Sequence, residues 1–490
     1  MDYINPIKKR REKITLYVGY FLMTILVILT TIILFYITEG FGYSKNGNVI
    51  QNGLLFFSSQ PNPANIYINN KLQSSQTNTS MLLPAGNYSV KIIKSGYLPW
   101  QRNIIVNGGL VERFDYPFLF PAHLITNKIA NYVSPPGFAT ESLDRHWLVV
   151  QDPSQFNEFY IYDLNNPLNP PTLITIPTSI LSTATSSQSW QLVQWSSDNQ
   201  HLVLKHIYDG SEEFILVDIT NGSKSVNLTK TFNSISFNSL SLLNNQYDQY
   251  DLYNSQSQVL DSVNLSAPLV INFSLSQVLA YKTYGSNNNI LYVTSLNAPS
   301  GRVVVNERVG SNTYIIKTLA PSPQYLLDLT TYNSTPYVVI GASDDSKVFI
   351  YQDPIGQINN NPSYVPAPIQ VLLVPNPNYI SFSDNAQFIM VENANHFAVY
   401  NIESGYAYNY IVPYQLQSPQ ATASWMDGDR LTYVTNNNLI VFDYDMANLH
   451  VLMPADPTYL PFFDVSYQYI YTISTKNNVT SLTQTSMLAP

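Results

Sequence analysis

The sequence contains no cysteine among its 490 residues. This absence excludes disulfide bonds, thiolate metal sites and cysteine nucleophiles, but it does not fix the redox compartment. Charged residues are also few, at 11% of the chain against about 25% in ordinary soluble domains. Hydrophobic residues still make up 45% and tyrosines number 37, so the chain can form large cores and is not intrinsically disordered. Its length predicts roughly two to four domains.

Positive charge is concentrated at the amino end. The first 13 residues contain two acids and five cations, which are Lys8, Lys9, Arg10, Arg11 and Lys13. Residues 14–490 contain 18 cations and 30 acids, so the two parts carry net charges of +3 and −12. We expect no nucleic-acid partner, because the acidic body of the chain has no basic stripe.

Only one hydrophobic run is long enough to cross a lipid bilayer. It begins at Ile14, is centred near Leu26 and ends at Ile37, which gives 24 residues without a charge. As a helix it would be about 36 Å long, enough for a hydrocarbon core of roughly 30 Å. All five early cations precede it. The positive-inside rule therefore predicts a cytoplasmic basic segment 1–13, a transmembrane helix 14–37 and an extracytoplasmic remainder.

A cleaved signal peptide is the alternative reading of this run. Its apolar part would span about 7–15 residues and would end at small residues. The run is longer, and the ITEGFGYSKNG that follows has no such cleavage site, so an uncleaved anchor in the cell membrane is favoured. A buried core helix is disfavoured, because no other long helical pattern exists to pack against it.

A compact β-module is predicted at residues 53–121, after a polar, Gly- and Asn-rich linker at 38–52. Apolar and polar residues alternate in four short segments, at residues 54–58, 65–69, 89–93 and 103–106. Such alternation is typical of half-buried strands. Several short strands at this spacing predict an antiparallel β-sandwich.

Three motifs follow one another in this module. They read SQPNPANIYINNK from residue 59, LPAGNYSVKI from residue 83 and KSGYLPW from residue 94. The residues that define them are Pro61, Ala64, Tyr67, Ile68, Pro84, Gly86, Tyr88, Gly96, Tyr97 and Trp100. The motifs resemble the PEGA domain family, although Pro63 replaces a usual Gly and Asn70 replaces the hairpin Gly. The resemblance implies an extracytoplasmic β-sandwich of prokaryotic surface proteins without catalytic residues, in which the large aromatic residues form the core.

A repeated unit occupies residues 122–490. Each copy has a polar turn with Asp or Asn, an apolar strand, a gap and a second strand that ends near Asp or Asn. The residues that mark the clearest turns are Asp144, Trp195, Asp198, Asp384, Trp425, Asp427 and Gly428. These copies resemble the hairpin of TolB-like and WD40-like β-propeller blades. In that hairpin, Asp-Gly or Asp-Asn adopts the positive φ of a tight turn.

Eight copies of the unit predict a β-propeller of about eight blades. The copies are centred near residues 162, 217, 253, 293, 351, 400, 442 and 482. Their mean spacing of about 46 residues fits propeller blades, which repeat every 40–50 residues or so. Seven blades is the nearest alternative, because the copies near 253 and 351 are weak, and a pair of stacked sandwiches is the rival fold. The last copy lacks a fourth strand, which residues 124–133 would supply if the ring closes there.

No arrangement of catalytic or metal-binding residues is recognised. The six histidines follow no zinc spacing, and they are His123, His146, His201, His206, His396 and His450. No nucleophile elbow or phosphate-binding glycine loop occurs. The acidic turns at 343–346 and 427–429 lack the spaced-acid pattern of calcium loops, so ordinary turns are favoured. We therefore predict no catalytic residue, no metal site and no cofactor.

Two functions of different classes follow from these predictions. The favoured one is a mainly β, single-pass surface protein whose propeller binds a protein or glycan partner or acts as a scaffold, without enzymatic activity. The alternative is a propeller hydrolase or lyase that acts on envelope or extracellular glycans or peptides. A structural spacer of the cell envelope is the third option. An acid and His cluster at one end of the propeller channel would favour the enzyme.

Overall fold

The computed structural model describes residues 6–38, 40–43, 49–285, 289–361, 365–414, 416 and 422–489. The chain divides into two compact units. One unit comprises Met1–His123 together with Leu488–Pro490, and the other is Leu124–Met487.

The apolar run forms the helix α1, which extends from Pro6 to Thr38. The predicted membrane-spanning run 14–37 lies within α1, and the basic residues that precede it lie on the first turns of the same helix. Lys, Arg and Glu have high helix propensity, and a proline at the first position is compatible with helix initiation. Within the described residues, α1 is the one helix long and apolar enough to span a membrane.

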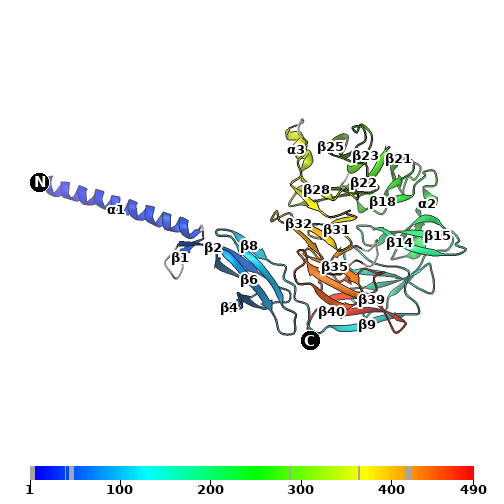
Figure 1. Cartoon of the computed structure of the whole chain (residues 1–490), viewed down its shortest axis with the longest axis horizontal. Coiled ribbons are helices and arrows are strands. Elements are labelled where there is room, and N and C mark those ends of the chain that lie inside the picture. The colour runs from blue at the N-terminus through cyan, green and yellow to red at the C-terminus, as the bar shows by residue number, and fades with distance from the viewer. Residues whose placement is uncertain are drawn as a thin grey trace, which may run out of the picture. The chain divides into compact units, whose positions relative to one another are not determined.

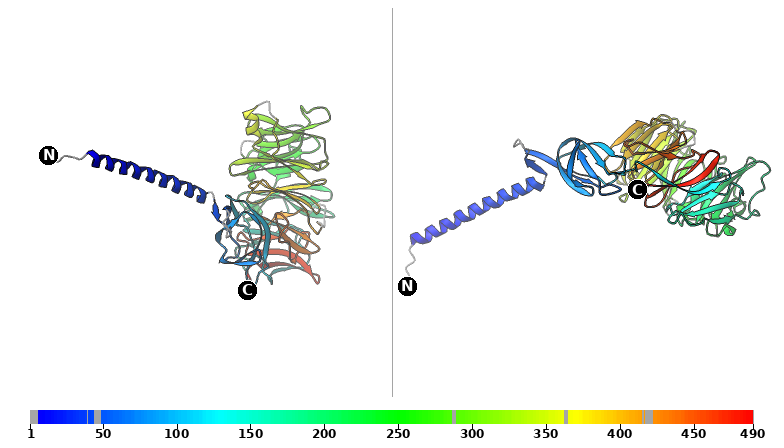
Figure 2. Two further views of the ribbon diagram at one scale, coloured as in Figure 1. Left: turned by 60° about the vertical axis from the view of Figure 1, so that its left-hand side comes forward. Right: turned by 90° about the horizontal axis from the view of Figure 1, so that it is seen from below.

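Polar side chains within α1 are satisfied by the helix itself. The hydroxyls of Thr15, Thr24 and Thr31 donate to the carbonyl oxygens of Arg11, Tyr20 and Val27, at 3.0, 2.8 and 2.8 Å. The apolar side chains are exposed all round the helix. Figure 2 shows α1 as a single continuous helix. A helix of this kind suits a hydrocarbon environment, in which unsatisfied polar groups are costly.

Two four-stranded sheets follow α1. In the first sheet, β2 pairs with β1, β5 and, in parallel, β8; the second has the order β4-β3-β6-β7. The strands are β1 (Phe41–Tyr43), β2 (Val49–Phe57), β3 (Asn65–Ile68), β4 (Lys71–Gln76), β5 (Thr79–Pro84), β6 (Gly86–Ile93), β7 (Trp100–Val106) and β8 (Val111–Phe114). The predicted linker 38–52 is wrong in part, because β1 and the start of β2 lie within it and pair with each other. Residues 39 and 44–48 of that linker lie outside the described residues.

The two sheets enclose an apolar core. Phe57, Ile66, Val90 and Trp100 are each at most 1% exposed within it. The sandwich predicted for this part of the chain therefore forms around aliphatic and aromatic residues that alternate along the strands.

The unit Leu124–Met487 contains eight four-stranded antiparallel sheets in its described residues, here called blades 1 to 8. Blade 1 consists of β10 (Ala139–Glu141), β11 (Trp147–Gln151), β12 (Glu158–Asp163) and β13 (Thr172–Thr175), and blade 2 of β14 (Gln188–Trp195), β15 (His201–Tyr208), β16 (Ser211–Asp218) and β17 (Val226–Asn227). Blade 3 consists of β18 (Ser239–Leu242), β19 (Gln249–Asn254), β20 (Val259–Asn264) and β21 (Ile271–Leu275), and blade 4 of β22 (Val278–Tyr284), β23 (Asn289–Thr294), β24 (Val303–Val309) and β25 (Asn312–Leu319). Blade 5 consists of β26 (Tyr325–Tyr332), β27 (Thr335–Ala342), β28 (Lys347–Gln352) and β29 (Gln370–Leu373), and blade 6 of β30 (Tyr379–Phe382), β31 (Phe388–Asn393), β32 (His396–Asn401) and β33 (Ala407–Ile411). Blade 7 consists of β34 (Ser424–Trp425), β35 (Arg430–Thr435), β36 (Asn438–Asp443) and β37 (His450–Pro454), and blade 8 of β38 (Phe462–Phe463), β39 (Tyr469–Lys476), β40 (Val479–Ser486) and β9 (Ile125–Tyr132). Short helices lie between some strands, namely η1 (Gly222–Lys224), α2 (Leu228–Thr231), η2 (Leu243–Asn245) and α3 (Pro354–Asn360).

Neighbouring blades pack face to face around a ring. Separate apolar clusters join blades 1 and 2, 2 and 3, 3 and 4, 4 and 5, 5 and 6, and 8 and 1. Phe388 and Trp425 stack between blades 6 and 7, and the Asp456 N–H donates to Ile473 O between blades 7 and 8 at 2.8 Å. The predicted eight-bladed propeller is confirmed, and the rival pair of stacked sandwiches is wrong. Two repeat centres, Tyr253 and Val293, lie on the second strand of their blades rather than the third.

The ring closes through a strand from its amino-terminal end. The strand β9 pairs antiparallel with β40, from Ile125 opposite Ser486 to Tyr132 opposite Thr480. This is the pairing predicted for residues 124–133. Figure 1 shows the blades running from cyan through green and yellow to red, with β9 lying beside β40. Closure gives blade 8 the fourth strand that its own segment lacks, and removes two unpaired sheet edges.

Candidate functional site

The turns between the first and second strands of the blades lie at one end of the propeller channel. The first strand of each blade is the innermost, because first strands of neighbouring blades contact each other, as β22 does β26 and β26 does β30. The predicted turn residues Asp144, Asp198, Asp384, Asp427 and Gly428 all lie in these turns, and Trp195 and Trp425 are the last residues of first strands. The fold therefore brings the predicted turn residues to the same end of the ring.

Three of these aspartates close their own turns. Asp198 Oδ1 accepts hydrogen bonds from the backbone N–H groups of Gln200 and His201, at 3.0 and 3.1 Å. Asp427 Oδ1 accepts from the N–H groups two and three residues ahead, both at 2.8 Å. Asp144 accepts in the same way from His146 N–H. A short carboxylate that bonds its own backbone explains why Asp recurs at this position.

Asp384 does not have this role. In its turn Asn385 Oδ1 accepts from Gln387 N–H at 3.0 Å and from Ser383 Oγ at 2.6 Å. Asn385 therefore closes the turn in blade 6, and the carboxylate of Asp384 is available for another contact.

That contact is Arg145, a residue that the sequence analysis did not single out. Its guanidinium donates to Asp384 Oδ2 in blade 6 and to Met426 O in blade 7, both at 2.6 Å. It also lies 5.6 Å from the ring centre of Phe463 and 4.9 Å from that of Tyr467, both in blade 8. Arg145 itself belongs to blade 1, and its side chain is 12% exposed. One guanidinium thus joins four blades.

Glu141 completes this group, which we call the Arg145 cluster: Glu141, Arg145, Asp384, Met426, Phe463 and Tyr467. Glu141 Oε2 accepts from the Phe463 N–H at 2.8 Å. Burial raises the pKa of Glu141 to about 7, although Arg145 opposes the shift. Burial also raises the pKa of Asp384, again against the effect of Arg145. Each charge in the cluster therefore has a partner within it.

A second ion pair lies beside the cluster in blade 7. Arg430 Nε donates to Asp427 Oδ2 at 2.8 Å, and both side chains are less than 10% exposed. Burial alone would lower the pKa of Arg430, but the charges of Asp427, Asp443 and Asp429 outweigh it and raise that pKa. The 427–429 turn is thus occupied by an arginine and by backbone N–H groups. Its carboxylate oxygens are not arranged as a calcium loop.

The two marker tryptophans make the same contact in different blades. Trp195 Nε1 donates to Thr140 Oγ1 on the first strand of blade 1, and Trp425 Nε1 donates to Ser381 Oγ on the first strand of blade 6, both at 3.1 Å. Each indole therefore bonds a hydroxyl of the preceding blade. Thr140 and Ser381 are not recognisable from the sequence, because a single hydroxyl residue in a strand carries no distinctive signal.

A separate polar cluster lies between blades 1 and 2. His206 Nδ1 is 2.9 Å from Glu213 Oε1, and both side chains are at most 3% exposed. Glu213 also accepts from Ser182 N–H and Oγ, both at 2.8 Å, and from Asn227 Nδ2 at 2.7 Å. Burial would raise the pKa of Glu213, but the bonds from His206, Ser182 and Asn227 outweigh it and lower that pKa to about 2.

His201 and His146 each contact an aspartate and an aromatic ring in separate places. His201 lies against Asp198, with its ring stacked on Tyr247 at 4.1 Å, and does not share a partner with His206. His146 stacks on Trp147 and faces Asp163 at 3.2 Å. In the part of the chain that the structure describes, no three His, Asp or Glu side chains are grouped as metal ligands.

The residues of the predicted PEGA motifs mostly lie in or beside the sandwich core. Ala64, Ile68 and Trp100 are buried, and Tyr88 and Tyr97 pack against the same core. Tyr67, Pro61 and Pro84 lie in or beside the strands β3 and β5, and Gly86 begins β6. Gly96 has a φ of +83°, which a residue with a side chain adopts rarely. Asn69 and Asn70 have φ of 49° and 63°, so asparagine fills both left-handed turn positions, including the one at residue 70 where the hairpin Gly is usual.

Comparison with known families supports this assignment. Residues 52–118 match the PEGA domain family. These residues are therefore a PEGA domain, preceded by an apolar helix and followed by a β-propeller. No curated protein is significantly similar to the chain in sequence.

Solved structures with related folds are distant in sequence. Hsv2p of Kluyveromyces lactis is 11% identical, with a TM-score of 0.41, and the match covers 67% of this chain and 100% of that one. The dihydro-heme d1 dehydrogenase NirN is 11% identical with a TM-score of 0.44, covering 71% and 72% of the two chains. An oligogalacturonate lyase in complex with manganese is 9% identical with a TM-score of 0.39, covering 74% and 98%. The propeller assignment rests on the strand order and the closure described above.

Proposed function

We propose that this chain is a single-pass membrane protein whose PEGA domain and propeller lie outside the cytoplasm, and that the propeller binds a protein or glycan partner without catalysing a reaction. The observation that carries the proposal is the Arg145 cluster, in which Arg145 bonds Asp384 and Glu141 accepts from the Phe463 N–H. A catalytic site needs acids, bases or cations that are available to a substrate. Here Arg145 is held by Asp384 and Met426.

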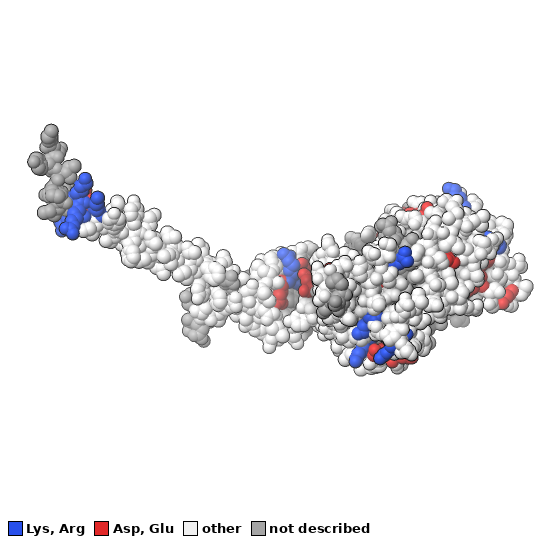
Figure 3. Space-filling model, turned by 90° about the horizontal axis from the view of Figure 1, so that it is seen from above, with Lys and Arg blue, Asp and Glu red and all other residues white. Residues whose placement is uncertain are grey.

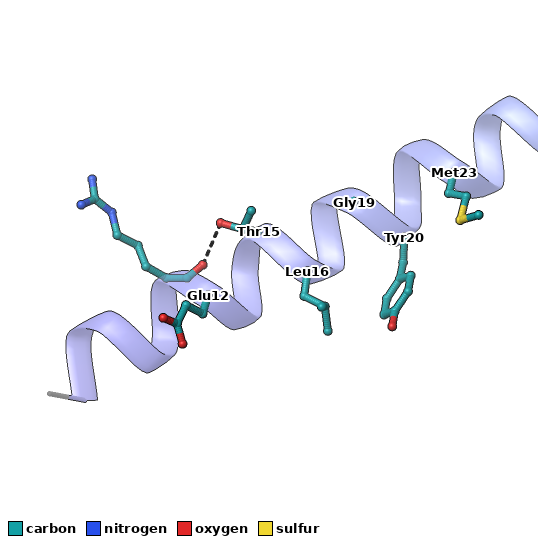
Figure 4. Close-up of a pocket in the computed structure, with 7 residues that line it drawn as sticks. Glu12, Thr15, Leu16, Gly19, Tyr20 and Met23 are labelled. Carbon is teal, nitrogen blue, oxygen red and sulfur yellow. Dashed lines mark hydrogen bonds between the residues drawn. The ribbon is translucent and has the colours of Figure 1, made fainter. Parts of the chain in front are cut away.

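The helix α1 supports the membrane location. Figure 4 shows one side of it, with Leu16, Tyr20 and Met23 projecting outward and Thr15 bonded to the Arg11 carbonyl. This side lines an open surface hollow of about 750 Å³ that no other described element faces. Acyl chains would fill such a surface, because it is apolar and its hydroxyl is already satisfied.

The charge distribution supports the orientation. Lys9, Arg10, Arg11 and Lys13 lie on the first turns of α1, before its apolar part. Figure 3 shows this basic end, in contrast with a largely uncharged visible face on the rest of the molecule. The positive-inside rule then retains the amino end in the cytoplasm and exports the β-domains.

Proteolysis of intact cells tests the topology. We expect a full-length chain with a different tag at each end to lose its carboxyl-terminal tag to external protease and to keep its amino-terminal tag. Protection of the carboxyl-terminal tag would contradict the topology. Loss of the amino-terminal tag before protease is added would instead identify α1 as a cleaved signal sequence.

Incubation with candidate ligands tests binding against catalysis. The full-length chain in detergent is incubated with glycan and protein arrays, and captured molecules are weighed by mass spectrometry. We expect capture without a change in ligand mass. A ligand that is cleaved during incubation would contradict the non-enzymatic proposal.

A hydrolase or lyase is the second candidate, and one observation favours it. Glu141 has a pKa raised to about 7 beside the Arg145 guanidinium, as a general acid or base would. If this group is catalytic, Glu141→Gln abolishes cleavage of glycans or peptides. Glu158→Gln, on β12 of the same blade, then leaves the cleavage unchanged. Under the favoured proposal neither chain cleaves a ligand.

A further inference from the structure

Three carboxyl side chains in the propeller are buried at junctions between blades without a cationic partner. Asp251 and Glu392 are 0% exposed and Glu307 is 4% exposed. The ion pairs among the described residues of the propeller involve other acids. The undescribed positions of this unit, residues 286–288, 362–364, 415 and 417–421, contain no Lys, Arg or His in the sequence.

Asp251 lies on β19 in blade 3 and faces blade 4. Its Oδ1 accepts a hydrogen bond from Ser262 Oγ. The hydroxyl of Thr283 and the phenol of Tyr281, both on β22, are the polar groups of blade 4 that face the same carboxyl. Hydroxyl groups both donate and accept, so these neighbours suit a protonated carboxyl as well as an ionised one.

Glu307 lies on β24 in blade 4 and faces blade 5. Tyr284 OH donates to its Oε1. Its Oε2 has no hydrogen-bond partner in the described part of the chain. The charged group of blade 5 that acts on it is another acid, Asp353, at the start of α3. The surroundings of Glu307 therefore disfavour its ionised form twice, through burial and through a like charge.

Glu392 lies on β31 in blade 6 and faces blade 7. Its two oxygens accept from one backbone group, the Ala423 N–H, at 2.9 and 3.2 Å. The titratable groups around it are the phenols of Tyr379 and Tyr410, which become negative on ionisation and so give no compensating charge. One N–H donor is little compensation for a fully buried carboxylate.

We propose that the propeller is adapted to an acidic exterior, in which these three carboxyl groups remain protonated and neutral at the blade junctions. As the medium becomes neutral, the carboxyl group at each junction has two options. It keeps its proton at a cost in folding free energy, or it ionises and leaves a buried negative charge without compensation. The exterior location rests on the proposed function, whereas the pH response belongs to the folded chain and is measured on it directly.

The direction of the effect follows from the two states of the chain. Burial raises the pKa of Asp251 to about 6, that of Glu392 to about 8, and also that of Glu307. In the unfolded chain these groups titrate at about pH 4. Their stabilising effect is thus complete below about pH 4, and it is lost as the pH rises through about 6 for Asp251 and about 8 for Glu392.

Two other groups of the propeller act in the opposite direction. Burial lowers the pKa of His450, and hydrogen bonds lower that of Glu213 to about 2 despite its burial. Both groups therefore destabilise the fold when the medium is acidic enough to protonate them. For this reason the test compares variants at two pH values and does not rely on the pH profile of the unchanged protein alone.

Thermal unfolding of the full-length chain in detergent tests the proposal. Glu392→Gln, Asp251→Asn and Glu307→Gln mimic the protonated groups, and Glu403→Gln changes an exposed acid of blade 6 as the control. We expect the first three variants to raise the unfolding midpoint relative to the unchanged protein at pH 7.5 and not at pH 4.5. For Glu392→Gln, the unfolding equilibrium constant should fall relative to that of the unchanged protein by about tenfold for each pH unit between the unfolded pKa of Glu392 and the pH of the measurement, up to its folded pKa. An equal difference at both pH values would overturn the proposal.

Infrared spectroscopy gives a second measurement that does not depend on variant stability. The folded, unchanged protein should show absorption by protonated carboxyl groups at pH 7, and Glu392→Gln should reduce it. If a variant fails to fold, the spectrum of the unchanged protein still decides. A folded chain at pH 7 without that absorption would contradict the proposal, whatever the topology experiment shows.

Discussion

The junction between blades 1 and 2 and the junction between blades 8 and 1 use the same structural position for different chemistry. The position is the last residue of a first strand, whose side chain faces the preceding blade. In blade 2 it is Trp195, which donates one neutral hydrogen bond to Thr140. In blade 1 it is Glu141, which accepts from the Phe463 N–H beside Arg145.

The difference corresponds to how the chain closes the ring. Blade 2 is built from four consecutive strands, whereas blade 8 is completed by β9 from the other end of the unit. An opening ring would separate β9 and blade 1 from β40. Arg145 crosses this opening, because it joins blade 1 to blades 6, 7 and 8. Apolar packing thus holds consecutive blades, and directional charged contacts reinforce the closure.

Removal of an indole should have the largest effect on this comparison. Trp195 is 3% exposed in the core between blades 1 and 2, so Trp195→Ala should destabilise the protein by about 3–5 kcal/mol. Trp195→Phe keeps most of the packing but loses the hydrogen bond to Thr140, so it should destabilise the protein clearly less than Trp195→Ala does. Denaturant unfolding of the full-length chain measures both changes. Equal losses for the two variants would mean that the hydrogen bond, and not the packing, holds this junction.

Acid should weaken the junction between blades 1 and 2 through Glu213. Its pKa is lowered from 4.5 to about 2, so its contribution is present above about pH 4.5 and is lost as the pH falls towards 2. The stability difference between the unchanged protein and Glu213→Gln should therefore shrink from pH 5 to pH 2. Glu212→Gln, an exposed neighbour paired with Lys205, should show no such trend.

Sequence patterns identified features that depend on local chain geometry. Asp144, Asp198 and Asp427 were found because a carboxylate that closes its own turn leaves a short, repeated signature. Asp384 was found by the same pattern, but Asn385 closes that turn. Arg145 was not found, because its partners Asp384 and Met426 are 239 and 281 positions away and only the closed ring brings them together.

The missed strands have a similar explanation. The strand β4 reads KLQSSQ and is exposed along nearly its whole length, so it shows no alternation. The strand β1 is three residues long and forms only because β2 extends back to pair with it. The eight-fold repeat was recognisable because each blade must bury its own strands, which imposes the same apolar pattern eight times.

Disruption of the β9–β40 pairing should open the ring itself. Backbone N–H groups of an edge strand point alternately to the partner strand and to solvent. Asn127 and Lys128 are adjacent in β9, opposite Gln484 and Thr483. One of the variants Asn127→Pro and Lys128→Pro removes an N–H that points to β40, and this variant should lower the free energy of unfolding by about 1–3 kcal/mol. The other variant removes an N–H that points to solvent and should lower it less. Protease sensitivity of the amino end of the propeller measures opening, and identical behaviour of the two variants would argue against the pairing.

Removal of the Arg145 guanidinium should have a smaller effect, of a kind that apolar junctions do not show. Asp384 is 47% exposed, so water can replace part of the lost contact, and Arg145→Met should cost about 1–2 kcal/mol. The cost should decrease at high salt, whereas that of Trp195→Ala should not, because salt screens charged contacts and leaves packing unchanged. The double variant Arg145→Met with Asp384→Asn should recover part of the loss, since it no longer leaves a carboxylate without its cation. A cost that is independent of salt and additive with Asp384→Asn would show that Arg145 acts through its packing on Phe463 and Tyr467. In that case the closure would rest on packing, as the contact of Trp195 between blades 1 and 2 does.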